Sequence, residues 1–568
     1  MSKPELSYQK LRGGYYTPKP IADFLARWAI RSSGLQVLEP SCGDGILLES
    51  ALQALIKHGA AKQEAVKLVH GVELDNEERL KTLERIRKLG FSPDPSIIHQ
   101  GDFFAYCREH LTDEDLLAYC DDREPQFFNA VIGNPPFIRY QNFPEDQRKP
   151  AFEIMQRAGM NPNRLTNTWV PFLVASSFLL AKHGRLAMVI PAELLQVNYA
   201  AELRRFLSRY FSKITLITFR KLVFEGIQQE VILLLAERDG DEHTGIRVIE
   251  LEGIGDLASY EPTDFSNREL KPMDHSTKKW TQYFLDEREI RLLRALRVNP
   301  ILTEAGQVID VDVGIVTGQN QFFVLNNEQI KGTSLKRYSQ PIVSRSGHLK
   351  GALFSEKDWH INAENNLPAY LLNIPDKPFD DLPGAAQAYI KVGEREGWHT
   401  GFKCRIRNRW YVVPSIWIPD AFMLRQVHGY PKIILNKAGA TCTDTIHRIR
   451  LRNGASGTVI AAAFLNSLTF AFSEVIGRSY GGGVLELEPN EAEKLPLPLK
   501  GAEKLDLGQI HNLLLKDNIG AVLEITDKAL LIDGLGLSER ETKMIRRIWG
   551  KLRDRRINRK HATKRDSA

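Results

Sequence analysis

The chain has 568 residues, of which 43% are hydrophobic and 26% are charged, and its formal net charge is +6. A chain of this length exceeds one hydrophobic core, and no apolar run reaches the about 20 residues that a membrane-spanning helix needs, so we expect several domains and no membrane span. Five scattered cysteines and the lack of an apolar signal-peptide core predict reduced thiols in the cytoplasm.

The first predicted helix begins at Thr17 and Pro18, where the threonine can cap the helix and the proline suits its first turn. A short apolar strand follows at 36–39, and residues 40–45 form a tight turn that opens a second helix. The turn lacks the GxGxxG and GxxxxGK[ST] patterns that bind phosphates. Its acidic side chains would repel a pyrophosphate and suit a cationic ligand with an amino group.

Two further predicted strands end in carboxylates. Glu73 follows the strand 68–72 and is suited to accept hydrogen bonds from ribose hydroxyls. Asp102 and Phe103 follow the strand 97–100, and a carboxylate beside an aromatic ring suits an adenine. Acidic residues and glycines commonly end strands, so each of these strand ends, taken alone, also has a purely structural explanation. Strands and helices alternate through this half, which predicts a doubly wound α/β sheet with one nucleoside–amino-acid cofactor at its edge.

The apolar strand predicted at 127–133 ends in the tetrapeptide Asn134-Pro135-Pro136-Phe137. Proline has no N–H, so this segment presents the asparagine side-chain oxygen and bare carbonyls, which are acceptors with almost no donors. Such a site suits an amine that donates two hydrogens and then acts as a nucleophile. Phe137 supplies a flat face for a base. For the two prolines alone, a strand that ends in a proline turn is the simpler interpretation.

Polar residues beyond about 240 predict a connection between domains, and three later stretches combine features of nucleic-acid binding. These stretches are a glycine-punctuated loop at 313–320, interleaved cations and aromatics at 402–411, and a glycine-rich segment at 478–483. The interleaving fits contacts with phosphates and bases. Surface arginines beside core aromatics explain any one stretch equally well.

The C-terminus is basic, with 11 Lys and Arg residues between Lys543 and Arg565 against one acidic residue, Asp554. Such a block attracts polyanions and is typical of a disordered arm, although a solvated tail that binds nothing specific accounts for it equally. The cysteines and histidines are irregularly spaced and no Cys-x-x-Cys is present, so we predict no metal site.

Residues 13 to about 240 resemble the gamma, TaqI-like class of S-adenosylmethionine-dependent adenine-N6 DNA methyltransferases of restriction–modification systems. The resemblance rests on the Tyr-x-Thr-Pro segment, the cofactor turns and the Asn-Pro-Pro-Phe motif, which occur in that order. It implies a class I, Rossmann-like methyltransferase domain with a mainly parallel sheet over 1–245 and a connection over 246–280. A mixed α+β target-recognition domain over 281–500 and C-terminal helices with a basic tail over 501–568 would follow.

By this resemblance, one group of residues holds the cofactor, S-adenosylmethionine. Glu73 would bind the ribose hydroxyls, Asp102 would accept from the adenine amine, and Phe103 would lie against the adenine ring. The residues implied to contact the methionine part are Thr17, Glu39, Ser41, Cys42 and Gly43.

A second group would act on the target adenine. Asn134 and the carbonyl of Pro135 would bind the target amine, and Phe137, after Pro136, would stack on the base. Phe224 is implied to stack on the far face of the flipped base, with Phe219 as the nearby alternative. The residues implied to contact DNA are Arg405, Arg407, Arg409 and Tyr480.

The implied reaction transfers a methyl group to the 6-amino group of a flipped-out adenine in double-stranded DNA. The expected partners are that DNA and a cognate restriction endonuclease acting separately, and we expect a monomer. Three alternatives stay open. The Asn-Pro-Pro-aromatic motif also occurs in enzymes that methylate RNA or protein glutamine, and a combined endonuclease–methyltransferase or a non-catalytic DNA-binding subunit are further hypotheses.

Overall fold

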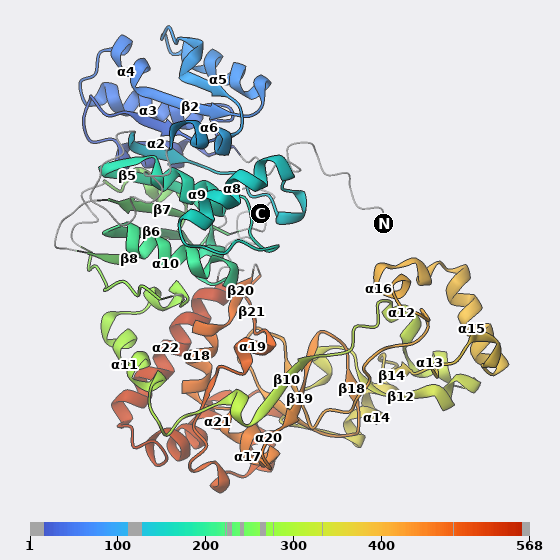
Figure 1. Ribbon diagram of the computed structural model, residues 1–568. Helices are drawn as coiled ribbons and strands as arrows, with labels where there is room; N and C mark the ends of the chain where they lie inside the picture. The colour runs from blue at the N-terminus through green and yellow to red at the C-terminus, as the bar shows by residue number, and fades with distance from the viewer. Residues whose placement is uncertain are drawn as a thin grey trace. The chain divides into compact units, whose positions relative to one another are not determined.

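The computed structural model describes residues 16–111, 128–221, 223, 230–238, 244–261, 268–276, 278–331, 333–480 and 482–558. The chain divides into two compact units (Figure 1). The first unit is Met1–Phe284 with Asn558–Ala568, and the second is Leu285–Ile557.

The first unit is built on an eight-stranded sheet with the order β3-β2-β1-β4-β5-β7-β6-β8. Pairing is parallel from β3 through β5, antiparallel on both sides of β7, and parallel between β6 and β8. The central strands are almost continuously buried and apolar, as expected when both faces of a sheet are covered. The strands are β1 Val37–Glu39, β2 Val69–Glu73, β3 Ile98–Gln100, β4 Phe128–Gly133, β5 Leu180–Pro191, β6 Lys213–Phe219, β7 Val231–Glu237 and β8 Gly245–Leu251.

Helices of the first unit pack on this sheet and on one another. Residues of α2 and α3 share one buried core with the sheet strands. The helices α6 and α9 meet through a stacked pair of rings, Phe103 and Phe172, whose centroids are 5.0 Å apart. The helices are α2 Lys19–Ala29, α3 Ile46–Lys57, α4 Lys62–Leu68, α5 Asn76–Lys88, α6 Phe103–His110, α8 Glu145–Arg157, α9 Trp169–Phe178 and α10 Ala201–Tyr210.

The stretch 246–280, expected to connect two domains, contributes to the first unit instead. Strand β8 begins at Gly245 and adds an edge to the sheet by pairing with β6. Lys271 then pairs with Ile246, and each backbone N–H donates to the carbonyl of the other at 2.8 Å. The sheet therefore extends through the stretch that the polar composition marked as a linker.

The second unit contains four smaller sheets, with the orders β10-β19-β15-β17-β13, β11-β14-β12-β18, β16-β21-β20 and β22-β9. The strands are β9 Thr303–Glu304, β10 Ile309–Val313, β11 Val324–Leu325, β12 Ser339–Val343, β13 Leu353–Ser355, β14 Tyr370–Leu372, β15 Ala421–Leu424, β16 Gln426–Val427, β17 Ile433–Lys437, β18 Thr441–Cys442, β19 Ile446–Leu451, β20 Arg478–Tyr480, β21 Val484–Glu486 and β22 Pro496–Leu497.

The helices of this unit are α11 Glu287–Arg297, α12 Asn320–Phe323, α13 Asn327–Ile330, α14 Glu356–Glu364, α15 Gly384–Arg395, α16 Phe402–Arg405, α17 Gly457–Ala463, α18 Ser467–Ile476, α19 Pro489–Ala492, α20 Leu507–Leu515, α21 Ile519–Thr526 and α22 Glu539–Asn558. The stretch 402–411, in which cations and aromatics are interleaved, begins with the short helix α16 and continues in turns.

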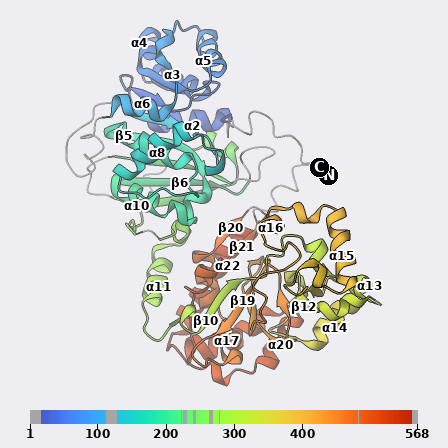
Figure 2. The ribbon, with the colours of Figure 1, turned by 45° about the vertical axis from the view of Figure 1, so that its right-hand side comes forward.

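Much of the basic C-terminal run is a folded helix rather than an arm. Helix α22 lies beside α18 (Figure 1), and the ring of Trp549 lies 5.1 Å from that of Phe470. Figure 2 shows α22 from a second side. Arg556 is 3% exposed and forms a bidentate ion pair with Glu474, at 3.0 and 2.6 Å. Lys551 pairs with Glu289 at 2.9 Å. These pairs neutralise charge that the sequence presents as a single-sign block.

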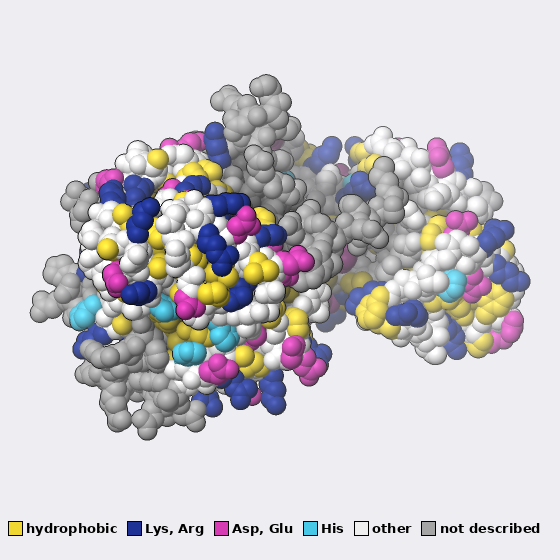
Figure 3. Space-filling view, turned by 90° about the horizontal axis from the view of Figure 1, so that it is seen from above, with side chains coloured by type: hydrophobic (Ala, Val, Ile, Leu, Met, Phe, Trp, Pro, Cys, Tyr) yellow, Lys and Arg dark blue, Asp and Glu magenta, His cyan; other side chains and the backbone are white. Residues whose placement is uncertain are grey.

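The described surface carries both signs of charge. On the face drawn in Figure 3, Lys and Arg side chains are interspersed with Asp and Glu. Within the described ranges, no single helix has the length and apolar composition of a membrane span, and one bent pair, α17 with α18, meets that criterion only when both helices are taken together.

Candidate active site

Five polar residues singled out in the sequence follow or end adjacent parallel strands, or lie next to them in the fold. Glu39 ends β1, Glu73 ends β2, Asp102 follows β3 and Asn134 follows β4. The order of the sheet changes direction between β1 and β4, and in doubly wound sheets ligands bind outside the carboxyl ends of the strands at such a point. Thr17, from the segment before α2, joins this group by a hydrogen bond to Asn134.

The two glutamates differ in burial and in hydrogen bonding, since Glu39 is buried and Glu73 is half-buried. Glu39 is 2% exposed, and its Oε2 has no hydrogen-bond partner among the described residues. Burial raises the pKa of Glu39 well above its ordinary value, and the nearby charges of Asp44 and Glu73 raise it further. Burial also raises the pKa of Glu73, against two backbone donors, the N–H groups of Gly43 and Asp75, each at 2.8 Å.

The turn between β1 and α3 depends on its glycines. Gly43 and Gly45 have φ angles of 50° and 78°, in the left-handed region that favours glycine. A Cβ on Gly45 would lie 2.7 Å from the methyl group of Thr82. The backbone N–H of Cys42 donates to Val72 on the neighbouring strand at 3.0 Å, and its thiol is buried. The turn therefore follows the sheet edge closely.

Asn134 is tied to both of these segments. Its side-chain Nδ2 donates to Thr17 Oγ1 at 3.1 Å, although the two residues are 117 positions apart. The hydroxyl of Ser41 donates to the backbone carbonyl of Asn134 at 3.4 Å. Because Nδ2 is directed at Thr17, the amide oxygen lies on the other side of the side chain.

The rest of the motif is held by Thr168, which precedes α9. Its hydroxyl donates to the carbonyl of Pro136 and accepts from the N–H of Ile138 at 3.0 Å. Its own N–H donates to the carbonyl of Ile138 at 3.0 Å. Among the described residues, no hydrogen bond reaches the carbonyl of Pro135. Phe137 lies between the fixed carbonyls and is half-buried.

Asp102 caps α6, since its Oδ1 accepts from the N–H groups of Phe104 and Ala105, both at 3.0 Å. Burial raises the pKa of Asp102. Phe103 is only 2% exposed, and its ring stacks on that of Phe172 at an interplanar angle of 19°. In this structure Phe103 is a core aromatic, and Asp102 is the more accessible member of the predicted pair.

Other predicted residues belong to the second unit or lie outside the described residues. Phe224 lies outside them, and its alternative Phe219 is 3% exposed within the core. Arg405 is exposed in the second unit, whereas Arg407 donates to the carbonyl of Val316 and Arg409 pairs with Asp376. Tyr480 ends β20.

A polar cluster that no sequence motif indicated lies next to Thr168, the residue that holds the motif. Asn167 donates from Nδ2 to the Tyr199 hydroxyl at 3.0 Å, and that hydroxyl donates to Glu193. Burial, with the neighbouring Glu193 charge, raises the pKa of Tyr199. The signal was present in the polar run 166–168 directly before a largely apolar helix, which is where cap residues occur.

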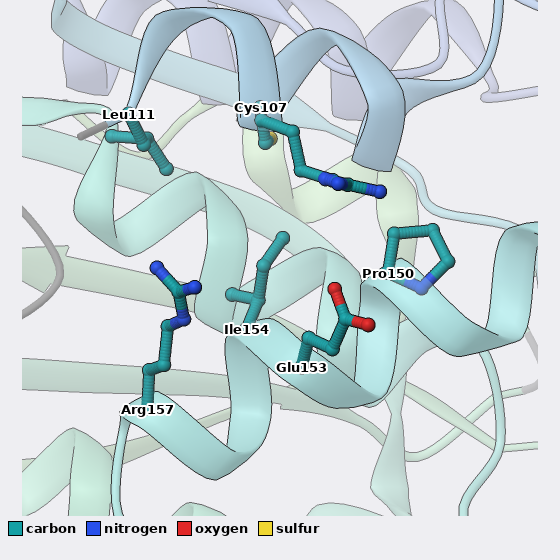
Figure 4. A pocket seen from close by; sticks show the side chains of 7 residues that line it. Cys107, Leu111, Pro150, Glu153, Ile154 and Arg157 are labelled. Carbon is teal, nitrogen blue, oxygen red and sulfur yellow. The ribbon is translucent and has the colours of Figure 1, made fainter. Parts of the chain in front are cut away.

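A separate hollow of about 210 Å³ lies between α6 and α8 (Figure 4). Arg157 and Glu153 of α8 reach into it, opposite Cys107 of α6. The hollow does not include the strand-end residues. Over the described ranges, no group of three or more His, Cys, Asp or Glu side chains is placed to hold a metal ion.

Comparisons with known proteins place these features in a family. Residues 6–291 match the family described as N-6 DNA Methylase, and residues 277–531 match the C-terminal domain of Type II methyltransferase M.Eco57I. Type II methyltransferase M.AccI of Acinetobacter calcoaceticus is 22% identical over 534 residues, which cover 89% of each chain. Type II methyltransferase M.XamI of Xanthomonas campestris pv. amaranthicola is 24% identical over 86% of this chain and 85% of its own.

A solved structure has the same overall fold. The Type IIL restriction-modification enzyme MmeI in complex with DNA aligns with 94% of this chain and 75% of its own, with 12% identity and a TM-score of 0.51. The mainly parallel α/β sheet that the sequence predicted for the first half is confirmed by the strand order and pairing.

Proposed function

This chain belongs to the N-6 DNA methylase family and is a DNA adenine methyltransferase of a restriction–modification system, and from that premise we propose which of its residues bind the cofactor and which act on the adenine. The proposal rests chiefly on one observation. The asparagine amide and the bare proline carbonyl of the motif lie at the carboxyl end of β4, beside β1, which ends in the buried Glu39, and two strands from β2, which ends in the half-buried Glu73.

Asn134 and Pro135 bind the exocyclic amine. This amine is a weak nucleophile because its lone pair is delocalised into the ring. Two acceptors, the Asn134 Oδ1 atom and the Pro135 carbonyl, draw its hydrogens out of the ring plane and localise the lone pair on nitrogen. Thr17 supports this role by taking the Nδ2 hydrogen of Asn134, which fixes the orientation of the amide. The Pro136 carbonyl is already engaged by Thr168, so Pro135 supplies the second acceptor.

S-adenosylmethionine supplies an electrophilic methyl group on a cationic sulfur, and the strand-end residues fit such a cofactor. The unpartnered, buried Oε2 of Glu39 suits a cationic or amino-bearing ligand and disfavours an anionic one. Glu73, held by two backbone N–H groups, would accept from ribose hydroxyls. Asp102 would accept from the cofactor adenine. Ser41, Cys42 and Gly43 would line the methionine part through their turn.

The chain's own groups then do three things in the transfer. The acceptors of the motif stabilise positive charge as it develops on the target nitrogen, which is the converse of an oxyanion hole. Phe137 stacks on the extruded base and partly offsets the stacking lost from the duplex, at about 1–3 kcal/mol per base. The nitrogen becomes cationic before its proton leaves, so no strong general base is needed. Positioning accounts for much of the rate.

The second unit carries the DNA-reading surface in this proposal, with Arg405 as its most accessible predicted contact. The protein acts as a cytoplasmic monomer, because one adenine in an asymmetric pocket needs no two-fold partner. A cognate endonuclease, where one exists, acts as a separate chain.

The experiment is single-molecule sequencing of DNA from a methylation-free host that expresses the chain, beside a host that expresses Asn134→Ala. We expect methylated adenine in one recurring motif for the first host and none for the second. Folded protein that leaves every adenine unmodified would refute the assignment and direct attention to RNA or protein glutamine. Cleavage of plasmid with Mg²⁺ would indicate the combined endonuclease–methyltransferase.

A further inference from the structure

One surface of the second unit exposes large apolar side chains next to cations. Phe402 is 64% exposed and Ile406 is 60% exposed, and they are one helical turn apart on α16 and its C-terminal cap. Val316 beside them is 40% exposed. We define the Phe402 patch as Val316, Phe402, Lys403, Arg405 and Ile406.

The backbone that carries the Phe402 patch is anchored to the core of the second unit. Cys404, in the middle of α16, is fully buried in a core cluster. Arg407 donates to the carbonyl of Val316 at 2.8 Å, and its guanidinium lies 5.8 Å from the centroid of the Phe323 ring. A Cβ on Gly318 would lie 2.9 Å from that of Lys403, so the two segments are in close contact. The exposed side chains of Phe402 and Ile406 are therefore held in place by a well-packed backbone.

Single exposed apolar residues are ordinary on protein surfaces, so exposure alone means little. The charges around this patch carry the argument further. Within the described part of the chain, Lys403, Arg405 and Arg407 have no carboxylate partner, whereas Arg409 pairs with Asp376. Lys403 lies 5.9 Å from the centroid of the Phe402 ring. The patch thus combines uncompensated positive charge with apolar groups that remain in water.

We propose that the Phe402 patch is a wedge for duplex DNA. Phe402 and Ile406 enter a groove and unstack one base step, and Lys403 and Arg405 contact the phosphates on either side. Apolar side chains that open a base step, flanked by cations on the backbone, are a known way to bend and hold a duplex. The inference rests on the proposed function, since it takes DNA as the substrate. A second copy of this chain is a poorer occupant, because it would bring the same unpaired cations together.

The wedge predicts two separable effects on binding. Phe402→Ala with Ile406→Ala removes stacking and should raise the Kd for the recognised duplex about tenfold, with the dependence on salt unchanged. Lys403→Ser with Arg405→Ser removes two phosphate contacts, so the slope of log K against log salt should become shallower by about 1.8. The matched controls are Leu515→Ala and Lys516→Ser at the end of α20, where both residues are also exposed.

The direct measurement uses 2-aminopurine placed in turn at each position of the recognition site, once that site is known from sequencing. With the wild-type protein, 2-aminopurine fluorescence should increase at one base step besides the target base. With Phe402→Ala plus Ile406→Ala, the increase at that step alone should be absent. All four residues are exposed, so thermal unfolding should match wild type in every variant.

The outcomes are distinct. If the wild type methylates its site but the apolar double variant binds and unstacks DNA normally, the wedge is wrong and the methyltransferase assignment stands. If light scattering reveals a dimer that the double variant loses, the patch binds a second copy and the wedge is also wrong. If the wild type modifies no adenine, the proposed function fails and the wedge fails with it.

Discussion

The side chain of Thr168 holds the carbonyl of Pro136, which lies 32 residues earlier in the chain. The same hydroxyl accepts from the N–H of Ile138, so one buried side chain fixes the residues on both sides of Phe137. The stacking face of Phe137 therefore depends on a threonine at the start of α9 as well as on the motif itself.

Replacing this hydroxyl tests its role as a positioning group. Thr168→Val keeps the shape and removes both hydrogen bonds, so we expect kcat to fall roughly 100-fold with little change in KM for DNA, as for a displaced reacting group. Thr168→Ser keeps the hydroxyl and should recover most of the rate. Steady-state methylation and target-site 2-aminopurine fluorescence check both variants. Equal losses in the valine and serine variants would point to packing instead.

Asn134→Ala removes one of the two acceptors for the target amine. We expect the rate of methyl transfer to fall by at least about 10³, because the acceptor acts mainly on charge that develops in the transition state. Binding of S-adenosylmethionine and DNA, measured by calorimetry and fluorescence anisotropy, should stay close to wild type. Asn142→Ala, at an exposed site in the next segment, is the matched control. A variant at position 134 that keeps most of its activity contradicts the assignment.

Glu39→Gln should make the cofactor-free protein more stable at neutral pH. Because burial raises the folded pKa of Glu39 above its ordinary 4.5, the folded state retains a proton that the unfolded chain releases. The stability that the protonated Glu39 contributes to the folded state is fully present below pH 4.5. It is lost as the pH rises through the raised folded pKa. A gain of about 1 kcal/mol would raise Tm by about 2–4 °C.

The same variant should lose its response to the cofactor. Thermal unfolding between pH 5 and pH 8, with and without S-adenosylmethionine, measures both effects. Glu64→Gln, an exposed glutamate of α4, is the control and should respond to the cofactor as wild type does. A Glu39→Gln protein that is still stabilised by S-adenosylmethionine would remove Glu39 from the cofactor site.

Arg556→Met should destabilise the second unit by about 3–5 kcal/mol, because it leaves the buried carboxylate of Glu474 without its partner. Removing both charges, as Arg556→Met with Glu474→Met, should recover part of that loss. Lys543→Ala on the same helix breaks only an exposed pair with Glu539 and should cost at most about 1 kcal/mol. Chemical denaturation of the full chain measures all three. A single Arg556 variant as stable as Lys543→Ala would show that the buried pair contributes little.

The local pattern of the sequence was sufficient to locate the strand ends of the first unit that carry the candidate site. Strands that end in Glu39, Glu73, Asp102 and Asn134 could be read in order, because an apolar run followed by a glycine or proline turn is encoded within about ten residues. The family resemblance then supplied roles for those ends. The second half could be predicted less well from the sequence, since its strands are short and hydrophobic alternation over a few residues is a weak signal.

Only the tertiary structure decided which side chains form hydrogen bonds and ion pairs with one another. The bond from Asn134 to Thr17, the hold of Thr168 on Pro136 and the pairing of Arg556 with Glu474 each join distant residues. The sequence by itself determined the strand ends and the chemistry that they offer, because hydrophobic periodicity and turn residues act locally. It could not determine which cations are neutralised, or that Oε2 of Glu39 lacks a hydrogen-bond partner among the described residues, because burial and hydrogen bonding arise only when distant segments pack together.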